Sequence, residues 1–302
     1  ISAKPYTFGV LPPAGLRNRR GVDVSMSNDS DAPKEVRIHH CWIHDFGKKA
    51  TTDYDETQNT VIRTAESAPH ANVSSKWLIE HNLFERCDCS RPTADGTGIA
   101  DRVGTVEPKS SDNVIRFNTY VDSPGLITLR QGFNNLIYGN WLENCGGIVV
   151  FGGEAATQFS RADTAQSDNH KVIGNYLRNT VAGIRLMAGQ DAAWTGASDT
   201  QHPAVDCLLV GNDSNLYEIG RKYGAAHIYP ARGTRLEACR KSSSGAFGTG
   251  TAITAGNLAS MVAMSGSSYN QTDTSATGAN TTAWTIPTPV KLTTSQVGPD
   301  AA

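Results

Sequence analysis

No apolar stretch in this sequence is long enough to span a membrane, so we expect no membrane contact. The first residues also lack the charged segment followed by an apolar core that marks a secretory signal. If the protein is exported, the sequence is therefore that of the mature form.

Neither sign of charge is in excess. The chain has 27 Lys and Arg residues against 29 Asp and Glu residues, which gives a net charge of -2. Nucleic-acid-binding domains usually carry a basic surplus, so we predict no nucleic-acid partner. An anionic ligand would have to be held by a local cluster of cations.

The six cysteines form no Cys-x-x-Cys pair and no Cys/His spacing typical of a metal site. We interpret them as buried thiols in the core. Only 38% of the residues are hydrophobic, while Gly, Asn, Ser and Thr are abundant. This composition favours short strands joined by many turns over a helical bundle.

A short unit recurs from residue 36 onward. Each copy is a β-rich strand followed by asparagine, and in most copies an apolar residue comes two positions later. The six copies begin at Val36, Trp77, Val114, Leu136, Val172 and Leu208, and the first has His40 in place of asparagine. A second apolar strand bounded by glycine follows three copies, at 125–132, 147–152 and 183–189, and 226–230 resembles a fourth.

The shortest spacing between equivalent positions is 22 residues, from Asn118 to Asn140. Periods in this range are typical of solenoids. Strand-only units with Gly and Asn at the corners predict an all-β fold, a single right-handed parallel β-helix. We expect the asparagines to stack as a hydrogen-bonded ladder at one corner, with one of His39 and His40 as its first member.

Polar insertions interrupt the units at 45–70, 86–104, 153–169 and 188–204. We expect these loops to leave the β-helix at its corners and to wall a groove along one face. Residues 1–240 would form the β-helix. Residues 241–302 would form a Ser/Thr/Gly-rich tail or cap of the same domain, with closing strands at 284–286 and 290–292.

Lys109 and Arg130 are 21 residues apart, which is close to one repeat. If each repeat is one coil, the two cations lie on neighbouring strands, about 4.8 Å apart, and face the same way. Two long cationic side chains placed in this way can flank one sugar ring. The alternative, on spacing alone, is a pair of solvated surface cations.

The segment Val-Glu-Pro-Lys-Ser-Ser-Asp-Asn-Val-Ile-Arg-Phe-Asn-Thr-Tyr at 106–120, with Ser-Pro-Gly-Leu-Ile-Thr-Leu-Arg-Gln-Gly at 123–132, resembles polysaccharide lyase family 6. That family includes alginate lyases and chondroitinase B. Glu-His-Asn-Leu-Phe-Glu-Arg-Cys at 80–87 and the glycine turns at 146–148 and 183–185 resemble further motifs of the family. The resemblance covers residues 35–190.

The resemblance implies β-elimination on an anionic uronic-acid polymer, outside the cell or in the periplasm. Alginate is the first candidate substrate, and dermatan sulfate or chondroitin is the second. Lys109 matches the family's base, which needs a lowered pKa, and a neighbouring arginine lowers it by like-charge repulsion. Because arginine rarely gives up a proton, we assign Arg130, the family's catalytic arginine, to charge stabilisation and to assisting the departing O4.

The resemblance also implies calcium, held in part by acidic residues five and seven positions before the lysine. This chain has Gly104 and Arg102 there, and neither supplies a carboxylate oxygen. We therefore predict no tightly bound metal or other cofactor, and we assign Arg102 to neutralising the substrate carboxylate. Glu107 shares a strand face with Lys109, and Gln131 replaces the histidine of the family's Arg-His-Gly motif while keeping a hydrogen-bond donor.

Further candidate substrate contacts come from two places. Arg185 follows a glycine turn, and His227, Tyr229, Arg232 and Arg235 lie where the family reads its polymer. The alternative for each is an ordinary surface position.

Two other functions stay open. A glycoside hydrolase on a β-helix needs two facing carboxylates; Glu107, Asp112 and Asp122 are available, but no pair stands out. A non-catalytic carbohydrate-binding β-helix, such as a tailspike-like adhesin, would suit the plain C-terminal segment. The oligomeric state is not determined by these residues.

Overall fold

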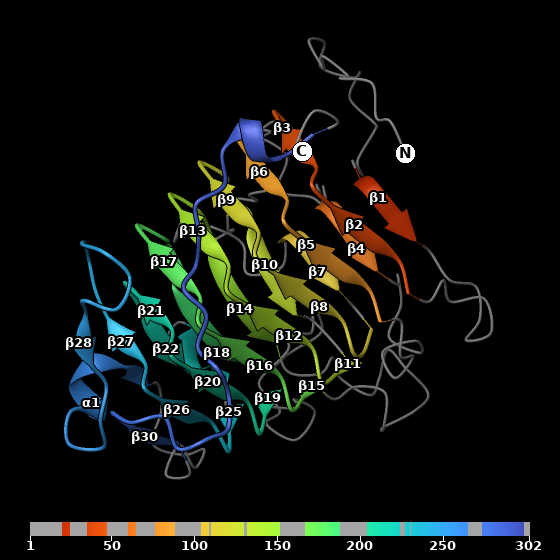
Figure 1. Cartoon of the computed structure of the whole chain (residues 1–302). Coiled ribbons are helices and arrows are strands. Elements are labelled where there is room, and N and C mark those ends of the chain that lie inside the picture. The colour runs from red at the N-terminus through yellow and green to blue at the C-terminus, as the bar shows by residue number, and fades with distance from the viewer. Residues whose placement is uncertain are drawn as a thin grey trace, which may run out of the picture.

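The chain turns repeatedly through the same three strand directions, so that strands distant in sequence stack side by side (Figure 1). The computed structural model describes residues 20–24, 35–46, 60–64, 76–87, 104–108, 110–129, 132–151, 167–187, 204–223, 227–229, 231–264 and 274–298. Nearly all of its regular elements are short strands in parallel sheets. The predicted all-β parallel β-helix is confirmed.

Three sheets of eight strands form the walls of the β-helix, and we name them A, B and C. Sheet A contains β1 (Arg20–Val24), β4 (Thr60–Thr64), β7 (Gly104–Pro108), β10 (Leu126–Leu129), β14 (Gly147–Phe151), β18 (Ile184–Met187), β22 (Tyr217–Ile219) and β29 (Ala263–Met264). Sheet B contains β2 (Arg37–His39), β5 (Leu78–Glu80), β8 (Val114–Arg116), β12 (Leu136–Tyr138), β16 (Lys171–Ile173), β20 (Leu208–Val210), β26 (Arg235–Glu237) and β30 (Ser275–Thr277). Sheet C contains β3 (Trp42–His44), β6 (Leu83–Glu85), β9 (Thr119–Val121), β13 (Trp141–Glu143), β17 (Tyr176–Arg178), β21 (Asp213–Ser214), β27 (Arg240–Lys241) and β28 (Thr251–Ala252), the last antiparallel to β27.

Short elements complete the described part of the chain. A four-stranded sheet contains β11 (Gly132–Phe133), β15 (Ser167–Asp168), β19 (Ala204–Val205) and β25 (Ala231–Arg232). An antiparallel hairpin pairs β23 (Arg221–Tyr223) with β24 (His227–Tyr229). The α-helix α1 (Leu258–Met261) and a 3-10 helix (Thr294–Gln296) are brief, and within the described ranges no helix has the length and apolarity to cross a membrane.

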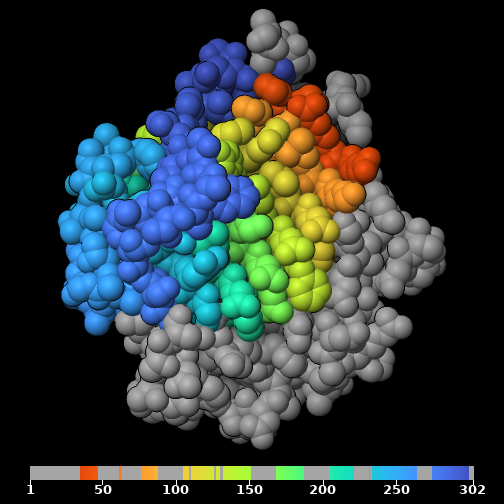
Figure 2. All heavy atoms as spheres, turned by 60° about the horizontal axis from the view of Figure 1, so that its bottom comes forward, coloured from red at the N-terminus to blue at the C-terminus, as the bar shows by residue number. Residues whose placement is uncertain are grey.

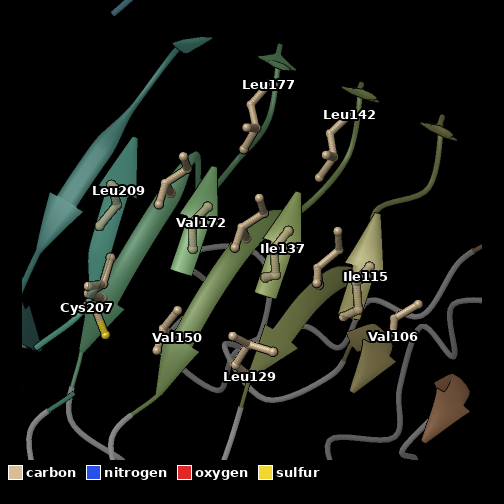
Figure 3. Close-up of a cluster of buried hydrophobic side chains, with 14 of the residues drawn as sticks. Val106, Ile115, Leu129, Ile137, Leu142, Val150, Val172, Leu177, Cys207 and Leu209 are labelled. Atoms are coloured by element: carbon tan, nitrogen blue, oxygen red, sulfur yellow. The ribbon is translucent and has the colours of Figure 1, made fainter. Parts of the chain in front are cut away.

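The core consists of inward-facing apolar rows, several of which appear in Figure 3. In sheet B the strand register aligns Ile38, Ile79, Ile115, Ile137, Val172, Leu209 and Leu236 in one such row. Alternate residues of a strand point to opposite faces, so a three-residue strand needs only one apolar residue to contribute to the core. Because each strand needs so few apolar residues, a chain that is only 38% hydrophobic can build a continuous core.

At the end of each of the first seven sheet B strands the chain turns a tight corner through a residue with positive φ. The corner residues are His40, His81, Phe117, Gly139, Gly174, Gly211 and Ala238. Directly after them comes a buried ladder containing Asn82, Asn118, Asn140, Asn175 and Asn212. The side-chain oxygen of each asparagine accepts a hydrogen bond from a backbone N–H of the coil before it, for example Asn82 N–H to Asn118 Oδ1 at 2.9 Å. The predicted asparagine ladder is confirmed.

The first member of this ladder is Cys41, so the prediction of His39 or His40 was wrong. The backbone N–H of Cys41 donates to Asn82 Oδ1 at 3.0 Å, as the later rungs donate to theirs. His40 is instead the corner residue, with φ of 53°. Its ring stacks on the ring of His81, with 5.2 Å between the centroids. His40 therefore packs against the corner residue of the next coil and does not join the ladder.

A second ladder, which the sequence analysis missed, lines the corner that precedes sheet B. Asn113 Oδ1 accepts from the Trp77 N–H, Asn135 Oδ1 from the Asn113 N–H, and His170 Nδ1 from the Asn135 N–H at 3.2 Å. Each rung lies five residues before a rung of the first ladder, as Asn113 does before Asn118. This offset is the signal that would have revealed it.

We expect His170 to make the protein less stable as the pH falls. Its ring is fully buried, and burial lowers its pKa from 6.5 to about 3. Below pH 6.5 the unfolded chain takes up a proton that the folded protein excludes. The free energy of unfolding should therefore fall by about 1.4 kcal/mol per pH unit from near pH 6 down to near pH 3, and this contribution should be constant above the unfolded pKa.

Urea unfolding at pH 8, 6 and 5 measures this effect, with His170→Asn as the variant because asparagine keeps an acceptor for the Asn135 N–H. The variant should lose less stability between pH 8 and pH 5 than the wild type. His39→Asn, at an exposed position, is the matched control and should follow the wild type. Parallel pH curves for the wild type and His170→Asn would contradict the expectation.

Five of the six cysteines lie in the described part of the chain, all as free thiols. Cys87, Cys145, Cys207 and Cys239 are buried at the corners, and burial raises the pKa of Cys87 and of Cys145 to about 12. The prediction of core thiols is confirmed for these four. Their thiols are too weakly acidic to serve as nucleophiles.

Residues 278–298 run back across the coils from β30 toward β3, and we call them the C-terminal strap (Figure 1). Near its start, the Tyr138 hydroxyl donates to the Thr285 carbonyl at 3.1 Å. Midway, the Leu292 N–H donates to the Thr119 hydroxyl at 2.8 Å. At its end, the Gly298 N–H donates to the His40 carbonyl at 2.6 Å. The strap therefore links the last coil to the first.

The corner glycines make room for this strap. A Cβ on Gly211 would fall 2.6 Å from Ile286, and one on Gly174 would collide with the Pro287 ring. Both glycines also have φ near +60°, a conformation that disfavours a side chain. Trp284 and Ile286 pack on Ile173, Leu208 and Val210 of sheet B, which closes a second apolar cluster outside the β-helix.

The predicted strands at 284–286 and 290–292 are not present. These residues make side-chain and single backbone contacts to the coils without strand pairing, because they cross the strands instead of running beside them.

Strands β29 and β30 continue sheets A and B at the C-terminal end. The division at residue 240 falls inside β27, which pairs with β21. Most residues of the four predicted insertions lie outside the described residues. The prediction of one loop at 45–70 was wrong, because Thr60–Thr64 forms β4 inside sheet A.

Candidate active site on the outer face of sheet A

Strands β7 and β10 of sheet A lead directly to the two predicted catalytic cations. The strands are parallel neighbours, with Gly104 opposite Leu126 and Val106 opposite Ile127, and the register shifts between these pairs. The described part of β7 ends at Pro108 and that of β10 at Leu129. Lys109 and Arg130 follow these strands in sequence but lie outside the described residues, as do Gln131 and Arg102.

Polar side chains occupy the face of these strands that points away from the core. Val106 and Ile127 belong to the core cluster, so the next residues, Glu107 and Thr128, lie on the outer face. Both are fully buried. In the register of β4 and β7, Arg63 is opposite Glu107. The outer face of sheet A is therefore a covered, polar surface at the strands that precede Lys109 and Arg130.

Arg185 lies on the same outer face, two strands beyond β10. Its position in β18 is in register with Val149 of β14 and Glu218 of β22. Arg185 Nε and Glu218 Oε2 form an ion pair at 2.6 Å, and their side chains are 10% and 15% exposed. The structure thus puts Arg185 on the predicted face and fixes its guanidinium against a carboxylate.

The remaining candidates are spread over other elements. His227 and Tyr229 belong to the hairpin strand β24, which follows sheet A strand β22 through β23. Arg232 belongs to β25 of the four-stranded sheet, where it is in register with Val205. For these three residues only the backbone is described. Arg235 lies in β26 of sheet B, and so it is separated from the outer face of sheet A.

The fold matches that of known enzymes, although no family model matches the sequence and no curated protein does so either. An alginate lyase of polysaccharide lyase family 6, solved with a trisaccharide, aligns with a TM-score of 0.56 and 17% identity over 87% of this chain and 54% of its own. A mannuronic-acid-specific family 6 lyase from human gut microbiota aligns with a TM-score of 0.51 and 18% identity over 73% of this chain and 44% of its own. A family 6 lyase from Pseudopedobacter saltans aligns with a TM-score of 0.50 and 17% identity over 87% of this chain and 63% of its own.

The chain has the fold of the family 6 polysaccharide lyases. The resemblance noted in the sequence is thereby confirmed at the level of fold. The chain spans about half the length of the first two lyases, 54% and 44%. At 17–18% identity the alignment concerns the backbone, and the chemistry has to be argued from this chain's own residues.

The donor set does not fit the calcium that the family 6 resemblance implies. Gly104 opens β7 without a side chain, and Arg102 is a cation, so neither position offers an anionic oxygen. Within the described ranges, no cluster of three or more His, Cys, Asp or Glu residues is arranged to hold a metal ion. We derive no catalytic step through calcium.

Proposed function

We propose that this protein is a polysaccharide lyase that cleaves a uronic-acid polymer by β-elimination, with alginate as the first candidate substrate. The observation that carries the proposal is the pairing of β7 with β10, in which Val106 is opposite Ile127. Lys109 and Arg130 each come three residues after this pair. A register that continues unbroken would make them neighbours on the outer face of sheet A, at the spacing of about 4.8 Å between strands.

In the proposed reaction, the neutral amine of Lys109 removes the proton on C5 of the uronate. The C5–H electron pair forms the double bond between C4 and C5, and the C4–O4 bond breaks with its electrons passing to O4. The departing O4 then takes up a proton from a water molecule that Arg130 orients. Because the C5 proton is only weakly acidic, the adjacent carboxylate must be neutralised as negative charge develops on it.

The neighbouring cations have separate roles in this scheme. Arg130 stabilises the developing charge and keeps the Lys109 amine neutral by like-charge repulsion. Arg102 neutralises the substrate carboxylate in place of a metal, and Gln131 donates a hydrogen bond to the sugar. Glu107, two residues before Lys109 on one strand, orients the Lys109 side chain.

The polymer beyond the cleaved bond needs its own contacts. In the proposal Arg185, His227, Tyr229 and Arg232 bind neighbouring sugars. Arg185 is supported by its place on the outer face of sheet A, where Glu218 holds its guanidinium in one orientation. A preorganised guanidinium loses little freedom on binding a carboxylate.

An ultraviolet assay tests the proposal. Incubation with alginate, polyguluronate, polymannuronate and dermatan sulfate should generate the absorbance of an unsaturated uronate end on at least one polymer. New reducing ends without this absorbance would instead indicate a hydrolase. No cleavage of any polymer would leave a non-catalytic binding protein and would overturn the proposal.

The same assay with a chelator tests the absence of calcium chemistry. Because Gly104 and Arg102 provide no carboxylates, a lyase built on this site should keep its activity, within about twofold, after dialysis against EDTA. Added calcium should not raise it. A loss of tenfold or more that calcium restores would show that other residues supply the oxygens.

A further inference from the structure

The outer face of sheet B carries its own pattern of charge. Strand register aligns its outward side chains in two rows that run across the coils. One row contains Arg37, Leu78, Val114, Leu136, Lys171, Leu208 and Arg235, and the other contains His39, Glu80, Arg116, Tyr138, Ile173, Val210 and Glu237. Four of these residues are cations and two are carboxylates.

The cations reach solvent to differing extents, and the carboxylates are buried. The side chains of Arg37 and Arg116 are 55% and 40% exposed, whereas Glu80 is 1% exposed. Arg235 is exposed and Lys171 is half-buried, while Glu237 is buried. Solvent on this face therefore meets positive charge, although the whole chain has a net charge of -2.

The four cations lie on alternate strands, three of them in the first row and Arg116 in the second. Arg37, Arg116, Lys171 and Arg235 lie on β2, β8, β16 and β26, which are the first, third, fifth and seventh strands of sheet B. Successive cations are thus two strands apart, or about 10 Å across the sheet, with Arg116 displaced by two residues, about 7 Å, along its strand. We call these four residues the cation row, and together they extend over about 29 Å of the sheet. That length suits an extended polymer better than a small molecule.

Two of the guanidinium groups are held in fixed positions. Arg37 Nε donates to Glu80 Oε1 at 2.8 Å, and Arg116 Nε donates to Glu80 Oε2 at 2.7 Å, so one buried carboxylate orients both. Arg116 also lies over the Phe117 ring, 5.6 Å from its centroid. Guanidinium groups fixed in this way lose little side-chain freedom when they bind an anion.

The strap covers part of this face, where Trp284 and Ile286 pack on Ile173, Leu208 and Val210. In Figure 2 the strap (blue) crosses the coils, and a band of described surface from orange through green lies uncovered beside it. Lys171 Nζ sits 5.2 Å from the centroid of the Trp284 ring at the edge of the strap. At the corner before the strands, Lys76, Asp112 and Asp206 contribute charges of both signs.

We propose that the cation row Arg37, Arg116, Lys171 and Arg235 is a second binding surface for the anionic polysaccharide. It lies on sheet B, whereas the strands that precede Lys109 and Arg130 lie in sheet A. The inference rests on the proposed function for the identity of the polymer. An extended uronate chain that presents alternate carboxylates to one side matches cations on alternate strands, and binding there keeps the polymer near the protein between cleavages.

Binding of the full-length protein to immobilised alginate tests the proposal, with Lys171→Gln/Arg235→Gln as the first variant because neither change isolates a buried carboxylate. The dissociation constant should rise about 5- to 20-fold at 50 mM NaCl and much less at 500 mM, where salt screens surface charge.

Arg37→Met/Glu80→Met/Arg116→Met is the second variant. It removes the triad together, so that Glu80 is not left buried without its partners. Arg178→Gln, an exposed arginine in sheet C, is the matched control and should bind as the wild type does.

Kinetics separate this inference from the proposed function. In the sheet B variants KM for alginate should rise while kcat, and kcat/KM for a short oligosaccharide, stay unchanged. If the protein makes no unsaturated ends but its alginate binding still depends on the cation row, the lyase proposal fails and the second surface stands. Unchanged alginate binding in both variants would overturn the second surface. Equal binding of polyglutamate, lost in the same variants, would also overturn it, because the row would then be a nonspecific anion contact.

Discussion

Replacement of Lys109 by alanine is expected to lower kcat on alginate by about 10²- to 10⁴-fold, the usual contribution of a positioned general base. The residue follows β7 directly, and its sequence distance from Arg130 equals that between the paired residues Val106 and Ile127. Removing the amine leaves the polymer-binding residues in place, so KM should change little. Initial rates from the ultraviolet absorbance of the product measure both constants.

The control for this experiment is Lys291→Ala. That lysine lies on the strap and forms a solvent-accessible ion pair with Glu143 of β13, and such pairs contribute little to stability. Its removal should leave kcat unchanged. Both variants should melt close to the wild type, and small primary amines should partly restore activity to Lys109→Ala alone. Unfolding of Lys109→Ala, or full activity in it, would remove Lys109 from the proposed mechanism.

Removal of the C-terminal strap is expected to produce the largest loss of stability. Deleting residues 278–302 would uncover Ile173, Leu208 and Val210, each of which is at most 5% exposed. Exposing three such side chains should lower the free energy of unfolding by about 3–5 kcal/mol. Because solenoid coils otherwise contact only their neighbours, loss of the strap should also split one cooperative transition into two. Urea unfolding followed by circular dichroism and by tryptophan fluorescence measures both effects.

A single substitution tests the contact between Gly174 and Pro287 of the strap. Gly174→Ala adds a Cβ against Pro287 at a residue with φ of +60°, so overpacking and backbone strain combine, and we expect about 2–5 kcal/mol of destabilisation. Gly248→Ala is the matched control, because Gly248 has φ of +83° with open space around it and should lose about 1–2 kcal/mol from strain alone. Adding Pro287→Gly to Gly174→Ala should recover part of the difference. Equal effects of Gly174→Ala and Gly248→Ala would mean that packing of the strap does not depend on the contact between Gly174 and Pro287.

The local signals in the sequence were sufficient for the fold class. A strand, an asparagine and a glycine turn repeat from one copy to the next, and each repeat reports a short-range requirement: an inward apolar residue, a corner and a buried amide. The first ladder followed directly from this pattern. Its first rung was misplaced because His40 occupies the positive-φ corner that glycine occupies in three later coils.

The candidate site was predictable only in part. The 21-residue spacing of Lys109 and Arg130 agrees with the register of β7 and β10, because these two strands are neighbours in sheet A and follow each other one coil apart in the chain. The Arg185–Glu218 pair was not predicted, since 33 residues separate its members and that distance matches no repeat length visible in the sequence. A periodic pattern reveals neighbours only where no insertion changes the length of the coil.

By itself, the sequence determined that this chain winds into a β-helix and that asparagines form a ladder at one of its corners, because these properties depend on residues a few positions apart. Only the tertiary structure decided which coils touch across insertions. It brings Arg37 and Glu80, 43 residues apart, into one ion pair, and it lays the C-terminal strap over glycines in three earlier coils. Stacking converts an irregular spacing along the chain into a regular spacing between strands, so the cation row of sheet B exists only once the coils have formed.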